Sequence, residues 1–157
     1  DIIQIEDQEL IVNFLDIMEN HKMLVENSGL LTVAALKHLD CKNKKVVSIL
    51  SGGNMDIITL SSVVQHGLIQ RGRVFTVSVQ LPDRPGELGK VANVIAEMKG
   101  NVIRLEHNQF VSINRNAAVE LRITMEAFGQ EHKKEIIDRL KKEGYTPKEE
   151  SPTGIYE

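Results

Sequence analysis

Residues 75–100 read FTVSVQLPDRPGELGKVANVIAEMKG, and three patterns in this stretch decide the fold of the second half of the chain. Apolar and polar residues alternate over 75–81, which predicts a strand with one buried face. The sequence PDRPG at 82–86 ends that strand, because proline and glycine favour a turn. Apolar residues then recur at helical spacing from Leu88 to Ile95, and the glycine at position 100 is placed to end that helix.

The rest of the sequence repeats these patterns and completes a domain. We expect a strand at about 101–110 and another over 118–125, where the alternation resumes. A helix is expected over 129–143 and a short last strand from about 144, which Pro147 confines to a sheet edge. The order β-α-β-β-α-β predicts a ferredoxin-like α+β sandwich with one antiparallel sheet and both helices on one face.

The first 70 residues carry the pattern of a different fold class. Apolar spacing predicts an amphipathic helix from about Glu6, and 28–39 is apolar on almost every side, which predicts a largely buried helix. The β-branched run 44–50 predicts a strand, the SGGN sequence at 51–54 a turn, and 56–69 another helix. Strand, glycine turn and helix make one unit of a parallel α/β sheet, whose strands need neighbours on both sides.

Two domains are therefore expected, divided where a helical pattern stops at Gly72. Residues 1–71 are interpreted as the end of a larger α/β domain, and residues 72–157 as the complete sandwich. The first 70 residues carry a net charge of −4 and the others a net charge of +1, which agrees with two units. The chain begins with Asp1 in place of a methionine, which we interpret as a removed leader or an excised piece.

Composition limits the possible functions. The chain has 157 residues and a net charge of −3, which gives no reason to expect a polyanionic partner. Only 4% of residues are aromatic, and the strand expected over 118–125 lacks the stacking aromatics of RNA-recognition modules, so nucleic acid is excluded as a partner. No apolar run approaches the roughly 20 residues of a membrane span, so we expect a cytoplasmic protein with no membrane partner. Cys41 is the single cysteine and the five histidines are scattered, so no disulfide or metal site is expected.

The loop at 82–86 is a candidate ligand site. A glycine lets the backbone approach a ligand closely, and the start of the following helix offers N–H groups and a positive dipole end to a carboxylate. The same residues also form a good turn, and on physical grounds alone a plain turn is the favoured interpretation.

The sequence LPDRPGEL at 81–88, the amphipathic helix after it and the GNVI sequence at 100–103 resemble the ACT domain family, whose members are regulatory amino-acid-binding modules. The resemblance covers about 73–150. It implies association through the sheets, with an amino acid bound between the loop after the first strand of one copy and the start of the second strand of another. It assigns the effector contacts to Asp83, Arg84, Gly86, Leu88 and Asn101.

The first half resembles one enzyme family that carries such domains. VVSILSGGNMD at 46–56, a helix ending in GLIQRGR at 67–73, and MLVE at 23–26 resemble the carboxyl end of the threonine dehydratase catalytic domain, a fold-type II pyridoxal-phosphate domain. The resemblance implies that Ser51 hydrogen-bonds the pyridine nitrogen of the cofactor and that Gly52 and Glu26 also contact it. Without the resemblance, SGGN is interpreted as a turn between a strand and a helix.

Together the two resemblances imply the carboxyl-terminal part of a threonine ammonia-lyase, which converts threonine to 2-oxobutanoate and ammonia in isoleucine biosynthesis. The second domain would bind a branched-chain or related amino acid and form a homo-oligomer through its sheet. Two alternatives stay open: a free-standing amino-acid-sensing module, and a relative of serine dehydratases or racemases. The family's cofactor-bearing lysine and glycine-rich phosphate loop have no counterpart here, so the isolated chain is expected to be inactive and not to hold the cofactor tightly.

Overall fold

The computed structural model describes residues 2–108 and 119–151, and the chain divides into two compact units, Asp1–Gln70 and Arg71–Glu157. The expected strand ends at Phe110 and Ala118 lie outside the described residues.

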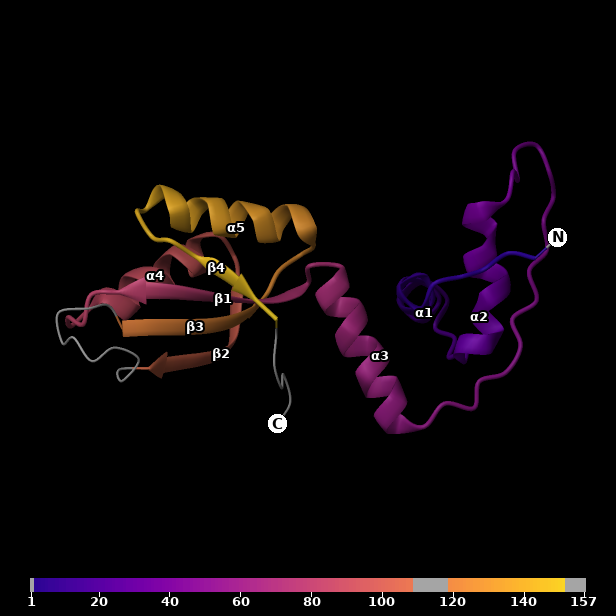
Figure 1. Ribbon diagram of the computed structural model, residues 1–157, viewed down its shortest axis with the longest axis horizontal. Helices are drawn as coiled ribbons and strands as arrows, with labels where there is room; N and C mark the ends of the chain where they lie inside the picture. The colour runs from indigo at the N-terminus through magenta and orange to yellow at the C-terminus, as the bar shows by residue number, and fades with distance from the viewer. Residues whose placement is uncertain (1, 109–118, 152–157) are drawn as a thin grey trace. The chain divides into compact units, whose positions relative to one another are not determined.

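The second unit is built on a four-stranded antiparallel sheet (Figure 1). Its strands lie in the order β2-β3-β1-β4, and they are β1 (Val74–Leu81), β2 (Asn101–Asn108), β3 (Val119–Glu126) and β4 (Lys148–Glu150). The two central strands pair along their whole length, and β4 pairs with β1 only over three residues. The ferredoxin-like prediction is confirmed, and the short strand after Pro147 does lie at an edge.

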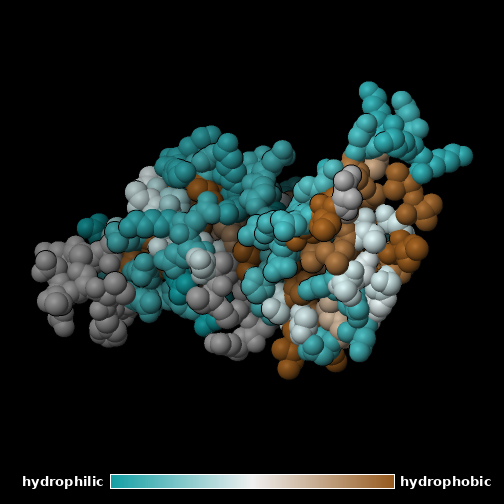
Figure 2. All heavy atoms as spheres, turned by 45° about the vertical axis from the view of Figure 1, so that its right-hand side comes forward, coloured by the Kyte–Doolittle hydropathy of each residue, from teal (hydrophilic) through white to brown (hydrophobic). Residues whose placement is uncertain are grey.

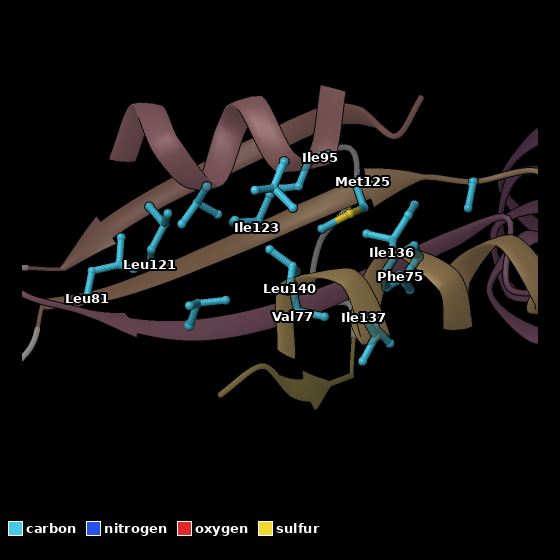
Figure 3. Close-up of a cluster of buried hydrophobic side chains, with 14 residues drawn as sticks. Phe75, Val77, Leu81, Ile95, Leu121, Ile123, Met125, Ile136, Ile137 and Leu140 are labelled. Atoms are coloured by element: carbon cyan, nitrogen blue, oxygen red, sulfur yellow. The ribbon is translucent and has the colours of Figure 1, made fainter. Parts of the chain in front are cut away.

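Helices α4 (Glu87–Glu97) and α5 (Gln130–Lys142) cover one face of this sheet. The alternating residues of β1 and β3 turn their apolar side chains toward these helices, where they meet Ile95, Ile136 and Leu140 (Figure 3). These three helix side chains have no exposed surface. The helices therefore cover the face of the sheet to which the apolar side chains of β1 and β3 point.

The opposite face of the sheet is polar and internally paired. Arg122 on β3 donates from Nε to Oε2 of Glu150 at 2.8 Å, and the Thr76 and Thr124 hydroxyls lie 2.9 Å apart. Arg104 on β2 forms an ion pair with Glu106 at 2.9 Å. Such a face has its hydrogen bonds satisfied without a further layer of structure.

A bulge in β2 changes which of its side chains face the helices. The pairing with β3 slips between Val102 and Arg104, so Val102 and Leu105 both lie opposite core residues although they are three positions apart. A bulge of this kind adds one residue to one strand of an antiparallel pair. The helix-facing row of β2 therefore consists of Val102, Leu105 and His107.

The first unit consists of helices. They are α1 (Asp7–His21), α2 (Asn27–Ala34) with a 3₁₀ turn η1 (Ala35–His38), and α3 (Ile57–Gln70). Phe14 and Leu15 of α1 and Leu30 of α2 are almost wholly buried. Gly67 lets α1 and α3 approach, because a Cβ there would lie 2.5 Å from the Leu15 side chain.

Two expectations for this unit were wrong. Residues 44–50 form no strand, and none of residues 2–70 is in a strand with which they could pair. An isolated extended segment has no partner for its backbone hydrogen bonds, so a β-branched sequence alone does not make it a strand. The helix over 28–39 is not largely buried: α2 ends at Ala34, and Leu31 is 42% exposed.

The first unit also exposes an unusual amount of apolar surface. Figure 2 shows brown, apolar side chains gathered over this part of the chain. Val47, Ile57 and Ile58 each leave more than four fifths of their surface exposed, and Ile49 leaves 74%. Contiguous apolar surface of this kind marks a face that packs against further protein.

Candidate functional site

The three residues assigned to the cofactor come together in the first unit. Glu26 precedes α2, and its backbone N–H donates to the Gly52 carbonyl at 3.2 Å. Gly52 has a φ of 77° and lies so close that a Cβ there would be 2.6 Å from the Glu26 carboxylate. Ser51 adjoins this contact, so the 51–54 turn and the start of α2 form one cluster.

Glycines shape the cluster by removing side chains where backbones meet. A Cβ on Gly29 would lie 1.9 Å from the Ser51 carbonyl oxygen, and one on Gly53 would lie 2.9 Å from the Leu24 carbonyl oxygen. The 51–54 turn therefore lies directly against the chain around α2. We call residues 26, 29 and 51–53 the glycine cradle.

Hydrogen bonds hold the cradle in place on both sides. The Ser28 hydroxyl donates to Glu26 Oε1 at 2.6 Å, and the Thr32 hydroxyl donates to the Ile49 carbonyl at 2.9 Å. Beyond the turn, Asp56 accepts from the Thr59 hydroxyl at 2.6 Å and from its N–H at 2.9 Å. These bonds hold the pKa of the Asp56 carboxyl below its usual value, so at neutral pH it is a charged cap at the start of α3.

The second unit contains a pocket of about 350 Å³ at the junction of β1 and α4. Its lining is Leu81, Pro82, Asp83, Arg84, Pro85, Gly86, Glu87, Leu88 and His107. Ligand pockets in proteins have volumes of roughly 300–1,000 Å³, so this one has the size for a small metabolite. Four of the five predicted effector residues are among those that line it.

Gly86 determines how the loop enters α4. It is the N-cap of the helix with a φ of 91°, and a Cβ there would meet nothing within 4 Å. The glycine is therefore required by the backbone conformation and not by crowding. The first turn of α4, at Glu87 and Leu88, therefore lines the pocket together with the loop.

The charged side chains around the pocket are of both signs. Lys90 donates to Glu87 Oε1 at 2.7 Å, and this hydrogen bond raises the pKa of Lys90. Asp83 and Arg84 are exposed on the loop, and neither side chain pairs with another residue among those described. The site thus offers one cation and one anion to a ligand.

Asn101, the fifth predicted effector residue, does not lie at this pocket. It begins β2, whereas the pocket lies at the other end of that strand with His107. Six residues at about 3.3 Å each put roughly 20 Å between the two positions. Asn101 instead donates from Nδ2 to Glu126 Oε2 at 2.8 Å.

His107 is the lining residue that the sequence reasoning missed, since the scattered histidines were interpreted as surface or satisfied core positions. Its place in an otherwise apolar row of β2 appears only in the register with β3. The sequence predicted that no metal site is present anywhere in the chain. Among residues 2–108 and 119–151, no three His, Cys, Asp or Glu side chains are grouped closely enough to hold a metal ion. Nor is any helix within those residues long and apolar enough to cross a membrane.

Comparison with known proteins finds similarity over both halves of the chain. The ACT domain family matches residues 75–144. The L-threonine ammonia-lyase of Geobacter sulfurreducens is 35% identical over 147 residues, and that of Thermotoga maritima is 30% identical over 146. The biosynthetic L-threonine dehydratase IlvA of Pasteurella multocida is 29% identical over 151 residues. Each comparison covers 92% of this chain.

The chain spans only 37%, 36% and 28% of the length of these three relatives. Because the ACT match begins at residue 75, likeness over 92% of the chain must include most of the first unit. Residues 75–144 therefore match the ACT domain family, and both units of the chain are similar in sequence to the L-threonine ammonia-lyases.

Proposed function

We propose that this chain is the carboxyl-terminal part of a cytoplasmic, pyridoxal-phosphate-dependent L-threonine ammonia-lyase, which converts threonine to 2-oxobutanoate and ammonia. Residues 1–71 would close its catalytic domain, and residues 72–157 would regulate it. The observation that carries the proposal is that the relatives match the first unit as well as the ACT domain. A free-standing sensing module would have no use for the glycine cradle, and the relatives compared above are named for threonine, not serine.

The cradle would present Ser51 to one side of the cofactor. Gly29, Gly52 and Gly53 let the 51–54 turn pack against the chain around α2, and Ser51, exposed on that turn, would donate its hydroxyl to the pyridine nitrogen. When bound, pyridoxal phosphate supplies an electron sink for cleavage at the substrate Cα. A hydroxyl does not favour a protonated ring as a carboxylate would. It therefore suits an elimination in which the β-hydroxyl leaves and little negative charge has to be stored.

The chain alone is expected to be inactive, because no lysine stands in a motif that would hold the cofactor covalently. Incubation with pyridoxal phosphate followed by dialysis should leave no absorbance near 410 nm, and threonine should yield no 2-oxobutanoate. A band that survives dialysis, or measurable 2-oxobutanoate, would contradict this expectation. The full-length parent is the positive control.

In the ACT domain, the β1–α4 pocket would take a free amino acid. The α-carboxylate suits the amino-terminal end of α4, where the dipole and the N–H groups favour an anion. Asp83 would then face the ammonium group, and Leu81 and Leu88 offer apolar surface to the side chain. Branched-chain or related amino acids match this combination of charge and apolar contact.

Association through the β2 edges would complete the site. β2 is an eight-residue edge strand, whereas the other edge, β4, has three residues. A long exposed edge favours addition of another strand. Antiparallel pairing of two β2 strands about their middle would bring Asn101 of one copy next to the pocket of the other.

Calorimetric titration of the chain with isoleucine, valine, threonine and serine tests this site. We expect at least one to bind, and Asn101→Ala to weaken that binding about tenfold, which is the loss of one hydrogen bond to a charged group. Asn93→Ala, on the exposed side of α4, is the matched control and should bind as the wild type does. If a folded, dimeric sample gives no heat with any of the four, the ACT domain serves assembly only.

A further inference from the structure

One wall of the β1–α4 pocket does not come from the loop. Eight of the nine lining residues are the consecutive run from Leu81 to Leu88, and the ninth is His107 on β2. His107 pairs with Leu121, which is wholly buried between the sheet and the helices. Directly opposite residues of an antiparallel pair point to the same face. The imidazole therefore lies on the helix-covered side of the sheet, across the pocket from the loop.

His107 lies at the exposed end of a row of side chains that is otherwise apolar. The row that crosses the sheet here continues from His107 through Leu121 to Val79, and both of these neighbours have no exposed surface. Within residues 2–108 and 119–151, the His107 ring has neither a hydrogen-bond nor an ion-pair partner, and His107 is exposed, so its ring is available to a ligand in the pocket.

The donors of the pocket converge from two sides. The lining contains the first turn of α4 and Arg84 from the loop, and His107 from the sheet. Glu87 is already paired with Lys90, which leaves Asp83 as the carboxylate without a described partner. Several donors around one free carboxylate suit a zwitterion that presents its own carboxylate to the donors.

On the basis of the proposed effector site, we propose that His107 is a binding residue for the amino-acid effector. Its imidazole N–H donates a hydrogen bond to the α-carboxylate from the sheet side, while α4 and Arg84 bind the same group from the loop side. Asn101 of a second copy would remain a separate contact, because the other β2 strand would bring it to the pocket.

The test compares His107→Leu with His107→Gln in the full 157-residue chain. The probe is whichever of isoleucine, valine, threonine or serine binds the wild type, together with its carboxamide. His107→Leu should weaken binding of the amino acid about tenfold, whereas His107→Gln, which keeps a donor, should stay within about threefold. The preference for the amino acid over its amide should shrink in His107→Leu. His66→Leu, exposed on α3, is the control and should change neither value.

The possible outcomes separate the role of His107 from the existence of the effector site. Wild-type affinity in His107→Leu, or an unchanged preference for the carboxylate, overturns the role of His107 and leaves the proposed effector site standing. Equal losses in the leucine and glutamine variants overturn the hydrogen bond and give His107 a packing role. Absence of binding to the wild type overturns the effector site itself, and this inference with it.

Discussion

Gly29→Ala is expected to unfold the first unit or to force the 51–54 turn away from α2. The new Cβ would lie 1.9 Å from the Ser51 carbonyl oxygen, and both groups belong to the backbone or are fixed to it. No flexible side chain can move aside, so the cost should be at the upper end of overpacking, about 3 kcal/mol or more. Hydrogen exchange of the α1 and α2 amides measures this loss.

Gly89→Ala is the matched control, since a Cβ there would meet nothing within 4 Å. Gly89 lies inside α4, where alanine is the better helix former by about 1 kcal/mol, so this variant should be slightly more stable than the wild type. Unchanged protection of α1 and α2 in Gly29→Ala would mean that the Ser51 carbonyl does not lie against α2. The glycine cradle would then lose its support.

Leu121→Ala should produce the second large effect, in the ACT domain. Leu121 is wholly buried on a central strand, opposite Val79, beneath the helix layer. Removing three carbons from such a position leaves a cavity and costs about 2–5 kcal/mol. Urea unfolding followed by circular dichroism and by tyrosine fluorescence reports the loss, because Tyr145, one of the two tyrosines of the chain, packs against this core.

Val102→Ala serves as the control for Leu121→Ala. Val102 lies on the same face of the same sheet, but at the edge and 36% exposed, so its loss should be under about 1 kcal/mol. Similar losses for the two variants would contradict a core centred on β1 and β3. A change confined to Leu121→Ala supports the fold as described.

The ACT fold could be predicted from the sequence because its central strands carry apolar side chains on one face and polar side chains on the other. In β1, Thr76 and Ser78 alternate with Phe75 and Val77, and this alternation indicates both the strand and its orientation. The bulge in β2 was not visible in the same way, because an extra residue breaks the alternation that reveals a strand. Its effect appears only in the register with β3.

The first unit was harder to predict because its apolar residues do not reveal what covers them. Val46, Val47 and Ile49 have the composition of a buried strand, yet each is exposed here, Val46 by 46% and the other two by more than 70%. Their apolar character indicates burial, and the described residues of this unit supply no sheet to bury them. The β-branched composition therefore indicated a tendency to form a strand, and the described residues of this unit contain no strand with which it could pair.

The candidate sites show the same division between local and distant information. Glu26 and Gly52 were predicted from motifs and do lie in contact, although 26 positions separate them in the sequence. The 81–88 loop was predicted as a unit because its residues are consecutive. His107 could not be added to it, since its place opposite the loop depends on strand order, which no motif states.

The separation of Asn101 from the β1–α4 loop has a consequence for how the protein would respond in a cell. If an effector requires both, a lone copy holds two unmatched halves, and affinity for the effector becomes a function of protein concentration. By mass action, dilution below the dimer dissociation constant would then weaken the response, and effector would in turn favour the dimer. The amount of protein made would thus set its sensitivity to the amino acid pool.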